Sequence, residues 1–350
     1  MSLPAGALVI SLDLELNWGV FDTLRLEDYR ENLLGVRRAV PGILELFRQH
    51  EIHATWAAVG MLCFSSREEL LRALPAKRPA YLRPEISAYN HIESVGQDEA
   101  TDPLHFGLSL VRQILAEPHQ EFATHTFSHY YCLEPGQDVE AFAADLQAAR
   151  SVAAQLGAEC RSLVFPRNQF NAEYVAACRA AGLAAYRGNQ RSWVYAPTAA
   201  AEQSLVRRGL RLLDAYLPLT GHHVYPHVHR VAEEQGICDI PASRFLRPYS
   251  PQLRALEPLR LRRIRSSMTY AARRGGLYHL WWHPHNFGAH TAENLAMLAR
   301  ILEHFVRLRK QYGMESLSMG EAAERTLGSP KTSPHTVQQT KPTNPVGAAV

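Results

Sequence analysis

Two acidic residues, Asp13 and Glu15, stand at the end of an apolar segment near the start of the sequence. The segment "ISLDLELNWG", which begins at Ile10, reads as a β-strand that leaves the hydrophobic interior. Side chains two positions apart in a strand point the same way, so both carboxylates are aimed at one place. A buried carboxylate is costly unless it is paired or bound to a metal ion. We therefore expect either a metal site here or ion pairs with nearby arginines.

A pair of histidines forms the second candidate group. "ATHTFSHYYC" places His125 and His129 four residues apart, directly after another apolar strand. If the chain turns into a helix there, both imidazoles lie on one face and can chelate one ion, with a carboxylate completing the site. In a chain with 17 histidines, two structural histidines would explain the spacing as well. Taken with the two acids, the pair predicts one metal ligand set and one spare carboxylate for proton transfer.

Two later segments carry an arginine and further histidines at strand ends. Arg167, in "VFPRNQFN", can either hold a carboxylate ionised or lie on the surface. In "YHLWWHPHNFG", strand alternation sends His279, Trp281 and His283 to one face. His283 is the best general-acid candidate, because it ends the strand and imidazole titrates near neutral pH. His285 follows a proline, so its direction does not follow from alternation, and both histidines can equally be structural.

These side chains need a scaffold in which several strand ends meet, and the sequence predicts one. Expected strands are residues 7–16, 52–60, 120–127, 160–168, 183–189, 276–284 and 314–319. Expected helices are residues 29–50, 65–74, 138–157, 171–182 and 291–313, with a break at Pro41. Repeated βα units imply a parallel sheet, either a barrel or a doubly wound sheet, with polar sites at the carboxyl ends of the strands.

The domain organisation is simple apart from a few regions without this alternation. Residues 75–106 are non-periodic, as a long active-site loop would be. Residues 190–275 read as an insertion, and the tail, residues 328–350, is rich in Pro, Thr, Ser and Gln and is expected to be disordered. We therefore expect one domain over residues 1–327.

The composition is that of a globular protein. With 350 residues, 46% of them hydrophobic and 20% charged, the chain can bury one large core or two small ones. The five cysteines form no CxxC pair, which suits reduced thiols in a cytosolic protein. The first apolar run is interrupted at Asp13 and lacks a basic start, unlike a signal peptide. We expect a cytoplasmic protein.

The charge is unevenly distributed along the chain. A net charge of +3 is too weak to argue for nucleic acid, and no nucleic-acid-binding motif is present. Between Arg244 and Arg274, however, there are nine arginines and one acid, Glu257. This Arg-rich stretch predicts a solvated helix face, or a surface that attracts phosphate or the anionic inner membrane leaflet.

In this order, the motifs resemble those of the polysaccharide deacetylase family, also called NodB-homology or carbohydrate esterase family 4 proteins. "HTFSH" matches the family's histidine motif, and "LWWHPHNFG" matches its last motif, an apolar strand that ends in histidine. Two segments depart from the family's usual motifs. "FPRN" takes the place of Arg-x-Pro, and "SLDLE" takes the place of Thr-Phe-Asp-Asp-Gly, with Leu14 where the family has its metal-binding Asp. The resemblance covers about residues 8–320. It is nearest to a divergent subgroup of bacterial surface-glycan gene clusters, in which D-x-E-L-x-W-G and HPHNF-like segments occur together.

The resemblance implies a fold and a role for each residue. The fold is α/β, a distorted (β/α)7 barrel. The ligands of a divalent metal, zinc or another ion, would be Glu15, His125 and His129. Asp13 would be the catalytic base, although the reverse assignment of the two acids stays open. Arg167 would keep that base charged, and His283 would be the general acid.

The implied activity is metal-dependent N-deacetylation of an amino sugar in a bacterial surface-glycan precursor, of the O-antigen, lipopolysaccharide or exopolysaccharide type. The partners would be the acetamido sugar or glycan precursor, with the phosphate of an activated sugar or the inner membrane as further contacts. The oligomeric state stays open. Two other readings are a metal amidohydrolase acting on a ureide or formamide, and a non-catalytic glycan-binding protein of the same fold, which Leu14 would favour.

Aromatic side chains supply candidates for the substrate pocket. Sugars often stack their apolar faces on aromatic rings, so Trp18, Trp56 and Trp282 can form the pocket wall, together with His285. Large hydrophobic tryptophans are more often core residues. We expect at most one of the three to contact a sugar.

Overall fold

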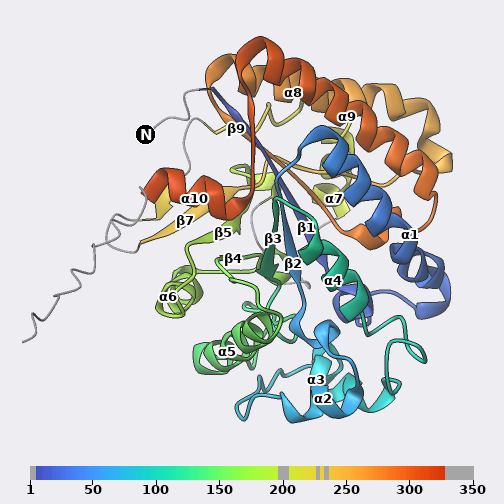
Figure 1. Cartoon of the computed structure of the whole chain (residues 1–350), viewed down its shortest axis with the longest axis vertical. Coiled ribbons are helices and arrows are strands. Elements are labelled where there is room, and N and C mark those ends of the chain that lie inside the picture. Colours follow the sequence, from blue (N-terminus) through green and yellow to red (C-terminus); the bar gives the residue numbers. More distant parts are fainter. Residues whose placement is uncertain (1–4, 196–204, 226–228, 232–235, 328–350) are drawn as a thin grey trace, which may run out of the picture.

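We describe the protein from a computed structural model, which places residues 5–195, 205–225, 229–231 and 236–327. A curled, mostly parallel sheet lies at the centre, and helices wrap its outside (Figure 1). The strands are β1 (Ala7–Leu14), β2 (Ala54–Ala58), β3 (Gln120–Thr124), β4 (Ser162–Leu163), β5 (Ala185–Gly188), β6 (His229–Val231), β7 (Ile237–Pro241), β8 (Arg244–Phe245), β9 (Leu277–Trp282) and β10 (Glu315–Leu317). The helices are α1 (Leu26–His50), α2 (Arg67–Arg72), α3 (Ala88–His91), α4 (Leu108–Ala116), α5 (Val139–Gln155), α6 (Ala172–Ala180), α7 (Leu205–Asp214), α8 (Glu257–Arg274), α9 (Thr291–Tyr312) and α10 (Met319–Leu327).

The sheet curls into a distorted barrel. The strand order is β6-β7-β5-β4-β3-β2-β1-β9-β8, with β10 beside β1, and all pairs are parallel except β6 with β7. Only Ala242 and Ser243 separate β7 from β8, and their amides donate hydrogen bonds to Gly188 in β5 and His279 in β9. This bent β7–β8 segment joins the two edges of the sheet. The barrel wall therefore has seven strand positions: β1, β2, β3, β4, β5, the β7–β8 segment and β9. This confirms the predicted (β/α)7 barrel.

Alternate residues of the strands face the barrel interior. The small or apolar residues at these positions form one buried cluster with α10: Ala7, Val9, Ala57, Ala123, Val164, Ala185, Cys238, Ile240, Leu277, Leu317, Met319, Ala322 and Ala323. Farther along the same faces the residues are polar, as with Ser11 and Asp13 on β1 and Arg187 on β5. On β1 and β5 the interior thus changes from apolar to polar toward the carboxyl ends, whereas β2, β3 and β4 also carry polar residues near their amino-terminal ends, namely Thr55, Glu121 and Ser162.

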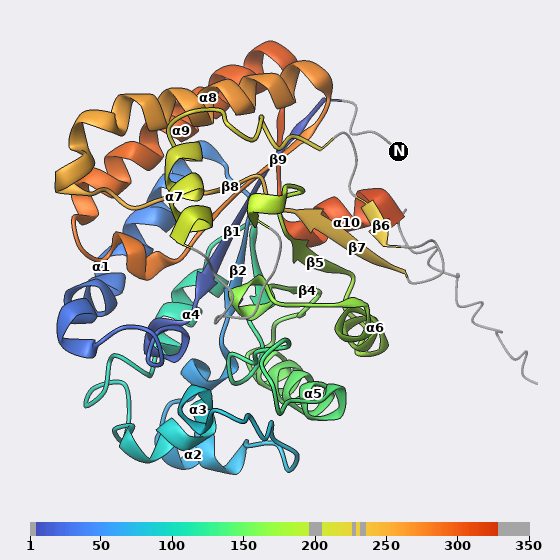
Figure 2. The same ribbon diagram turned by 180° about the vertical axis from the view of Figure 1, so that it is seen from behind.

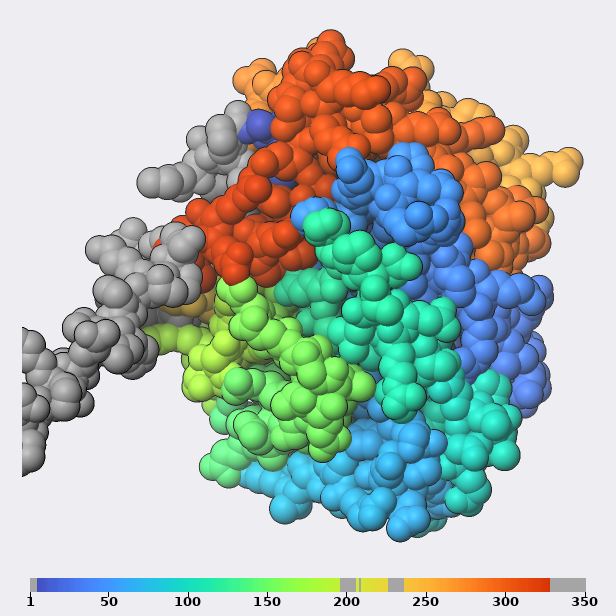
Figure 3. Space-filling model, in the orientation of Figure 1, coloured from blue at the N-terminus to red at the C-terminus, as the bar shows by residue number. Residues whose placement is uncertain are grey.

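The other face of β1 packs against the helices. Leu8, Ile10, Leu12 and Leu14 join a large buried cluster with α1, α8 and α9, and the last two helices lie side by side (Figures 1 and 2). Leu14 is therefore turned away from the barrel interior, because it stands between two interior-facing residues of an extended chain. The helical layer covers this side of the molecule (Figure 3).

Helix α1 differs from the prediction. It runs through Pro41 as one helix of 25 residues, so the predicted break is wrong. A proline inside a helix costs roughly 3 kcal/mol. The buried side chains on both sides of it, such as Val36, Ile43 and Phe47, each contribute about 1.5–3 kcal/mol when they leave water, which outweighs that cost.

The region expected as an insertion is narrower than predicted. Of residues 190–275, the strands β7 and β8 belong to the barrel wall and α8 to its helical layer. The sequence of β7, "ICDIP", hides this role because an aspartate and a proline interrupt its apolar pattern. Residues 328–350, for which we expected disorder, lie outside the described residues. Within the described ranges, no helix is long and apolar enough to cross a bilayer.

Candidate active site

Asp13 and Glu15 meet at the carboxyl-terminal mouth of the barrel. Asp13 is the penultimate residue of β1, and Glu15 follows the strand directly. Oδ2 of Asp13 and Oε1 of Glu15 each lie 3.6 Å from Nε2 of His283. The two carboxylates therefore converge on one region, as strand alternation predicts.

A tight turn after β1 makes room for Glu15. Leu16 has a φ of 49°, in the left-handed region that non-glycine residues rarely adopt, and it begins a 3-10 helix, Leu16–Gly19. A methyl group on Gly19 would overlap the carboxylate of Glu15. Glycine at this position thus lets the turn fold closely around the acid.

Glu15 contacts both histidines of the predicted pair. Its Oε2 lies 3.2 Å from Nε2 of His125 and 3.2 Å from Nε2 of His129, and all three side chains are buried. In a tetrahedral zinc site with bonds of about 2.0–2.1 Å, neighbouring donor atoms are roughly 3.3–3.4 Å apart. The three residues therefore have the spacing of ligands to a single ion.

The protonation of these groups suits a metal ion. Burial raises the pKa of Glu15, but the imidazoles of His283, His125 and His129 outweigh burial and hold that pKa well below its usual range. Nδ1 of His125 lies 2.8 Å from the carbonyl oxygen of Val164, to which it can donate. A proton held on Nδ1 leaves the Nε2 lone pair free for a metal. Burial also lowers the pKa of His129, which favours its neutral form.

A second chain of hydrogen bonds orients His129. Its Nδ1 lies 3.1 Å from the hydroxyl of Tyr131, which donates to Oδ2 of Asp22 at 3.1 Å. Because that hydroxyl proton points to Asp22, the Tyr131 oxygen can accept the Nδ1 proton of His129. Asp22 and Tyr131 carried no motif that sequence reasoning could have recognised.

His125 and His129 lie in a loop and not in a helix, the arrangement in which their spacing would put both imidazoles on one face. Thr126 and His129 have φ values of 62° and 58°, so the chain cannot continue as a right-handed helix. The loop brings the two imidazoles together through these left-handed residues. Non-glycine residues in this conformation persist only where the surrounding structure holds them, and they are frequent at functional sites.

Asp145 of α5 holds the loop. Its buried carboxylate accepts hydrogen bonds from the amides of Phe127 at 2.7 Å and Ser128 at 3.1 Å, and from the hydroxyls of Ser128 and Tyr89. Burial raises the pKa of Asp145 to about 6, against the effect of these hydrogen bonds. One carboxylate thus replaces the helical hydrogen bonds that the loop lacks.

Asp13 is paired with Arg187 of β5. The guanidinium donates to both carboxylate oxygens, at 2.6 and 2.7 Å, and both side chains are buried. The same guanidinium stacks on Trp281, 4.0 Å from the ring centre. Burial raises the pKa of Asp13, but Arg187 outweighs burial and holds the pKa below its usual value. Asp13 is therefore ionised and fixed in orientation.

Arg167, which sequence reasoning assigned to the base, does not contact it. The correction has a structural reason: Arg167 leaves β4 in the left-handed region, with a φ of 53°, and its Nη2 lies 2.5 Å from Oδ2 of Asp22. Its guanidinium covers the ring of Tyr131 at 4.1 Å. Arg167 therefore supports His129, whereas Arg187 holds Asp13 ionised, which is the role predicted for Arg167. The signal for Arg187 was a charge at an interior position of the short strand "LAAYRGN".

His283 is the accessible imidazole of the site. It follows β9, and 23% of its side chain is exposed. Its Nδ1 lies 3.2 Å from Oδ1 of Asn286, whose amide nitrogen donates to the hydroxyl of Tyr29 at 2.8 Å. This contact fixes the ring so that Nε2 faces the two carboxylates.

The other histidines of this segment are buried. His285 has its Nε2 3.7 Å from Oε1 of Glu15, and burial lowers its pKa to about 3. His279 lies deeper in the barrel, with Nε2 2.9 Å from Oγ of Ser11, and burial lowers its pKa to about 3 as well. Both are therefore neutral near pH 7, unlike a residue that delivers a proton.

Comparison with known proteins shows what this architecture is. No protein-family model and no curated protein matches the sequence. A solved structure from Mycobacterium smegmatis, assigned as a polysaccharide deacetylase, matches with a TM-score of 0.56 and 13% identity over 99% of this chain and 96% of that one. One from Pseudomonas aeruginosa PAO1 with the same assignment has a TM-score of 0.51 and 11% identity over 91% of each chain. The chain has the polysaccharide deacetylase fold.

The fold alone does not determine the reaction. A 4-alpha-glucanotransferase from Thermococcus litoralis matches with a TM-score of 0.52 and 14% identity, over 91% of this chain and 40% of that one. A polysaccharide deacetylase fold can thus be shared with enzymes of other chemistry, and function must be argued from the site.

The three tryptophans expected at the pocket are core residues. Trp18, Trp56 and Trp282 are fully buried, and the last two lie 6.2 and 6.3 Å from the ring of Phe47 in the helical layer. A ring enclosed in this way cannot stack on a sugar. The partly exposed Trp281, one residue before Trp282 and on the interior face, is the tryptophan that lines the site.

The Arg-rich stretch serves more than one purpose. Arg260 and Arg263 are buried and form ion pairs with Glu257 and Asp214, so they stabilise the fold. On the outer side of α8, a groove of about 450 Å³ is lined by three arginines and two hydroxyl residues: Arg262, Arg265, Arg300, Ser266 and Thr269. In this groove, Arg262 and Arg265 of the stretch and Arg300 of α9 could meet a phosphate.

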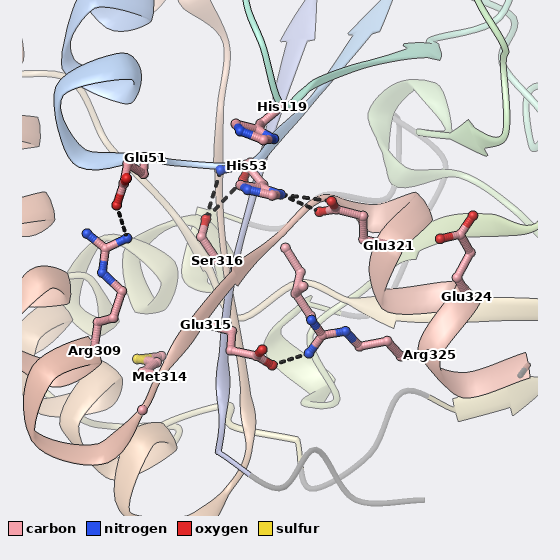
Figure 4. A pocket seen from close by; sticks show the side chains of 12 residues that line it. Glu51, His53, His119, Arg309, Met314, Glu315, Ser316, Glu321, Glu324 and Arg325 are labelled. Atoms are coloured by element: carbon pink, nitrogen blue, oxygen red, sulfur yellow. Dashed lines mark hydrogen bonds and ion pairs between the residues drawn. The ribbon is translucent and has the colours of Figure 1, made fainter. Parts of the chain in front are cut away.

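A separate hollow of about 560 Å³ lies at the opposite end of the barrel (Figure 4). His53 and His119 stack there at 4.1 Å, and Nδ1 of His53 lies 2.8 Å from the carboxylate of Glu321. Its remaining charges are also paired, as between Arg309 and Glu51 at 2.9 Å. The amino-terminal end of a βα barrel usually serves stability, so this hollow is not the candidate active site.

Proposed function

We propose that the protein is a metal-dependent N-deacetylase that hydrolyses the acetamido group of an amino sugar. One observation above all supports this: the ligand set of Glu15, His125 and His129 lies beside an arginine-paired carboxylate and an accessible imidazole. Amide hydrolysis needs an activated water, a base and an acid for the leaving nitrogen. The site contains a group for each task, and the shared fold agrees with the proposal.

The donor set fits a divalent metal ion. Two imidazoles and one carboxylate, all buried and with both Nε2 atoms 3.2 Å from the same oxygen of Glu15, suit zinc and also other first-row divalent ions. Glu15 is the better ligand of the two acids, since Arg187 engages both oxygens of Asp13. When bound, such an ion would lower the pKa of a water molecule and polarise the substrate carbonyl.

The remaining residues handle protons and orientation. Asp13 accepts the proton of the attacking water, and Arg187 keeps it ionised and aimed. As the carbon–nitrogen bond breaks, His283 delivers a proton to the departing amine, which would otherwise leave poorly. The water oxygen stays with the acetyl carbon, so the products are acetate and the free amino sugar. Trp281 offers an aromatic wall near these groups.

For the substrate, we propose a precursor of a bacterial surface glycan, acted on in the cytoplasm. Such precursors carry phosphate when they are linked to a nucleotide or a lipid. The groove of Arg262, Arg265 and Arg300 would suit that phosphate or an anionic membrane surface. Replacement of Arg262 and Arg300 by glutamate should then weaken binding of a nucleotide sugar or of anionic vesicles; unchanged binding of both would contradict it.

The decisive experiment combines metal analysis with acetate release. Purified wild type should contain metal and release acetate from acetamido sugars. Glu15→Ala and His125→Ala should lose the metal, whereas Asp13→Asn should keep it and lose about 10²–10⁴-fold in rate. His50→Ala, on the outer helix α1, is the matched control.

Each alternative predicts another result. Release only from ureides or formamides would identify a non-sugar amidohydrolase. Glycan binding by a protein that neither holds metal nor releases acetate would identify a non-catalytic member of the fold. Either outcome would overturn the deacetylase proposal.

A further inference from the structure

Glu15 has two carboxylate oxygens, and each faces its own pair of histidines. Oε2 lies 3.2 Å from Nε2 of both His125 and His129. Oε1 lies 3.6 Å from Nε2 of His283 and 3.7 Å from Nε2 of His285. Each pair of rings has its centres 5.0 Å apart, and each pair forms with Glu15 a group whose ligand atoms can surround one cation.

The second pair can offer lone pairs in the same way as the first. Nδ1 of His283 lies 3.2 Å from Oδ1 of Asn286, and the contact of Asn286 with Tyr29 turns that oxygen toward the ring. A proton held on Nδ1 leaves Nε2 bare. His285 is buried, with its Nε2 toward the same oxygen of Glu15.

We propose that the site contains a second, weaker cation position formed by Glu15 Oε1, His283 and His285, with Glu15 bridging the two ions. Three features make it the weaker one. Its donor atoms are farther apart than the roughly 3.3–3.4 Å of a tetrahedral zinc site. It adds no carboxylate of its own, because Arg187 neutralises Asp13. Within the described chain, moreover, Nδ1 of His285 has no hydrogen-bond partner to orient the ring.

Occupation of this position would inhibit the reaction, an argument that rests on the proposed function. His283 can donate a proton only while Nε2 carries one. A cation at Oε1 takes the Nε2 lone pair and excludes that proton. The protein should therefore be activated by the first equivalent of metal and inhibited by the second.

The test is a titration of chelator-treated protein with Zn²⁺. Calorimetry measures the affinities, and equilibrium dialysis with elemental analysis counts the bound ions. Wild type should bind two ions, the second at least tenfold more weakly. His285→Ala should lose only the weaker step, and Glu15→Ala should lose both. His222→Ala, outside the site in a His-His pair that can bind metal adventitiously, should keep both steps. Thermal unfolding of each variant shows whether it is folded.

The outcomes separate this proposal from the function. A single strong step that His285→Ala leaves unchanged would overturn the second position and leave the deacetylase proposal standing. No strong step would overturn both. The rate of acetate release by wild type should peak near one equivalent of Zn²⁺ and decrease when Zn²⁺ is in excess. In His285→Ala, excess Zn²⁺ should no longer reduce the rate below that variant's own maximum. Activity that rises through the second equivalent would overturn the inhibitory role.

Discussion

Replacement of Arg187 by methionine tests how the base is controlled. Arg187 makes two hydrogen bonds to Asp13 inside the barrel, and methionine keeps much of the side-chain length without the charge. Asp13 would then be a buried carboxylate with no cation beside it. The protein can respond by losing stability or by protonating Asp13.

The magnitude follows from the burial of both groups. Removal of one partner of a buried ion pair costs about 3–5 kcal/mol. Since about 1.4 kcal/mol corresponds to one pKa unit, the pKa of Asp13 should rise by about 2–4 units. The pKa of Asp13 lies below its usual value in the native protein, and in the variant it should lie above that value, because burial then acts without the guanidinium.

The pH dependence has a defined sign. In the native protein the folded pKa of Asp13 is below its unfolded value, so its contribution to stability is present above that value and is lost as pH falls through the folded pKa. In Arg187→Met the folded pKa lies above the unfolded value. The penalty is then absent at low pH and grows as pH rises toward the folded pKa. The difference in unfolding free energy between wild type and Arg187→Met should therefore be larger at pH 7.5 than at pH 5.0.

Two assays check the argument. Urea unfolding of the chelator-treated protein at pH 5.0 and 7.5 measures the stability difference. The acid limb of acetate release should move to higher pH by a similar number of units, because the base must be ionised. Arg167→Met is the matched control, because Arg167 pairs with Asp22 and not with Asp13. This substitution should weaken metal binding without moving the acid limb. A stability difference independent of pH, with an unmoved acid limb in Arg187→Met, would refute the role of Arg187.

Three further substitutions probe the shell around the metal ligands. Gly19→Ala should lower metal affinity at least tenfold in a chelator competition, because the new methyl group displaces the ligand carboxylate; Gly209→Ala, where a methyl group meets open space, should leave affinity unchanged. Tyr131→Phe removes the acceptor for Nδ1 of His129 and should weaken metal binding by about 10–100-fold, and an unaltered dissociation constant would count against that hydrogen bond. In Asp145→Asn, an NH₂ group replaces one carboxylate oxygen that now accepts hydrogen bonds from the loop. The free energy of unfolding in denaturant should therefore fall by about 1–3 kcal/mol, and an unchanged midpoint would disprove this role of Asp145.

The sequence could predict what strand geometry determines. Alternation places Asp13, Trp281 and His283 on interior faces, and repeated βα units place their ends at one mouth. These inferences need only the period of a strand and the direction of a parallel sheet. The convergence of Asp13 and Glu15 and the parallel sheet were predictable for this reason, whereas the choice of a (β/α)7 barrel over a doubly wound sheet came from the family resemblance.

The partners of these residues were not predictable, because they depend on contacts between distant segments. Arg187 lies within the short strand β5 and Arg167 follows β4, and only the curvature of the sheet decides which one reaches Asp13. Asp22 and Tyr131 meet in loops, where no period applies. The conformation at His125 was not predictable for the same reason, since a carboxylate from α5 holds that loop.

Leu14 illustrates how a departure from a motif can be a consequence of geometry. If Asp13 and Glu15 are both directed to the barrel mouth, the residue between them must face the helical layer. There Leu14 packs in the main hydrophobic cluster. A carboxylate at this position would be buried without a partner, at a cost of several kcal/mol. Leucine is therefore what an Asp-x-Glu arrangement requires, and its presence is no evidence that the chemistry has been lost.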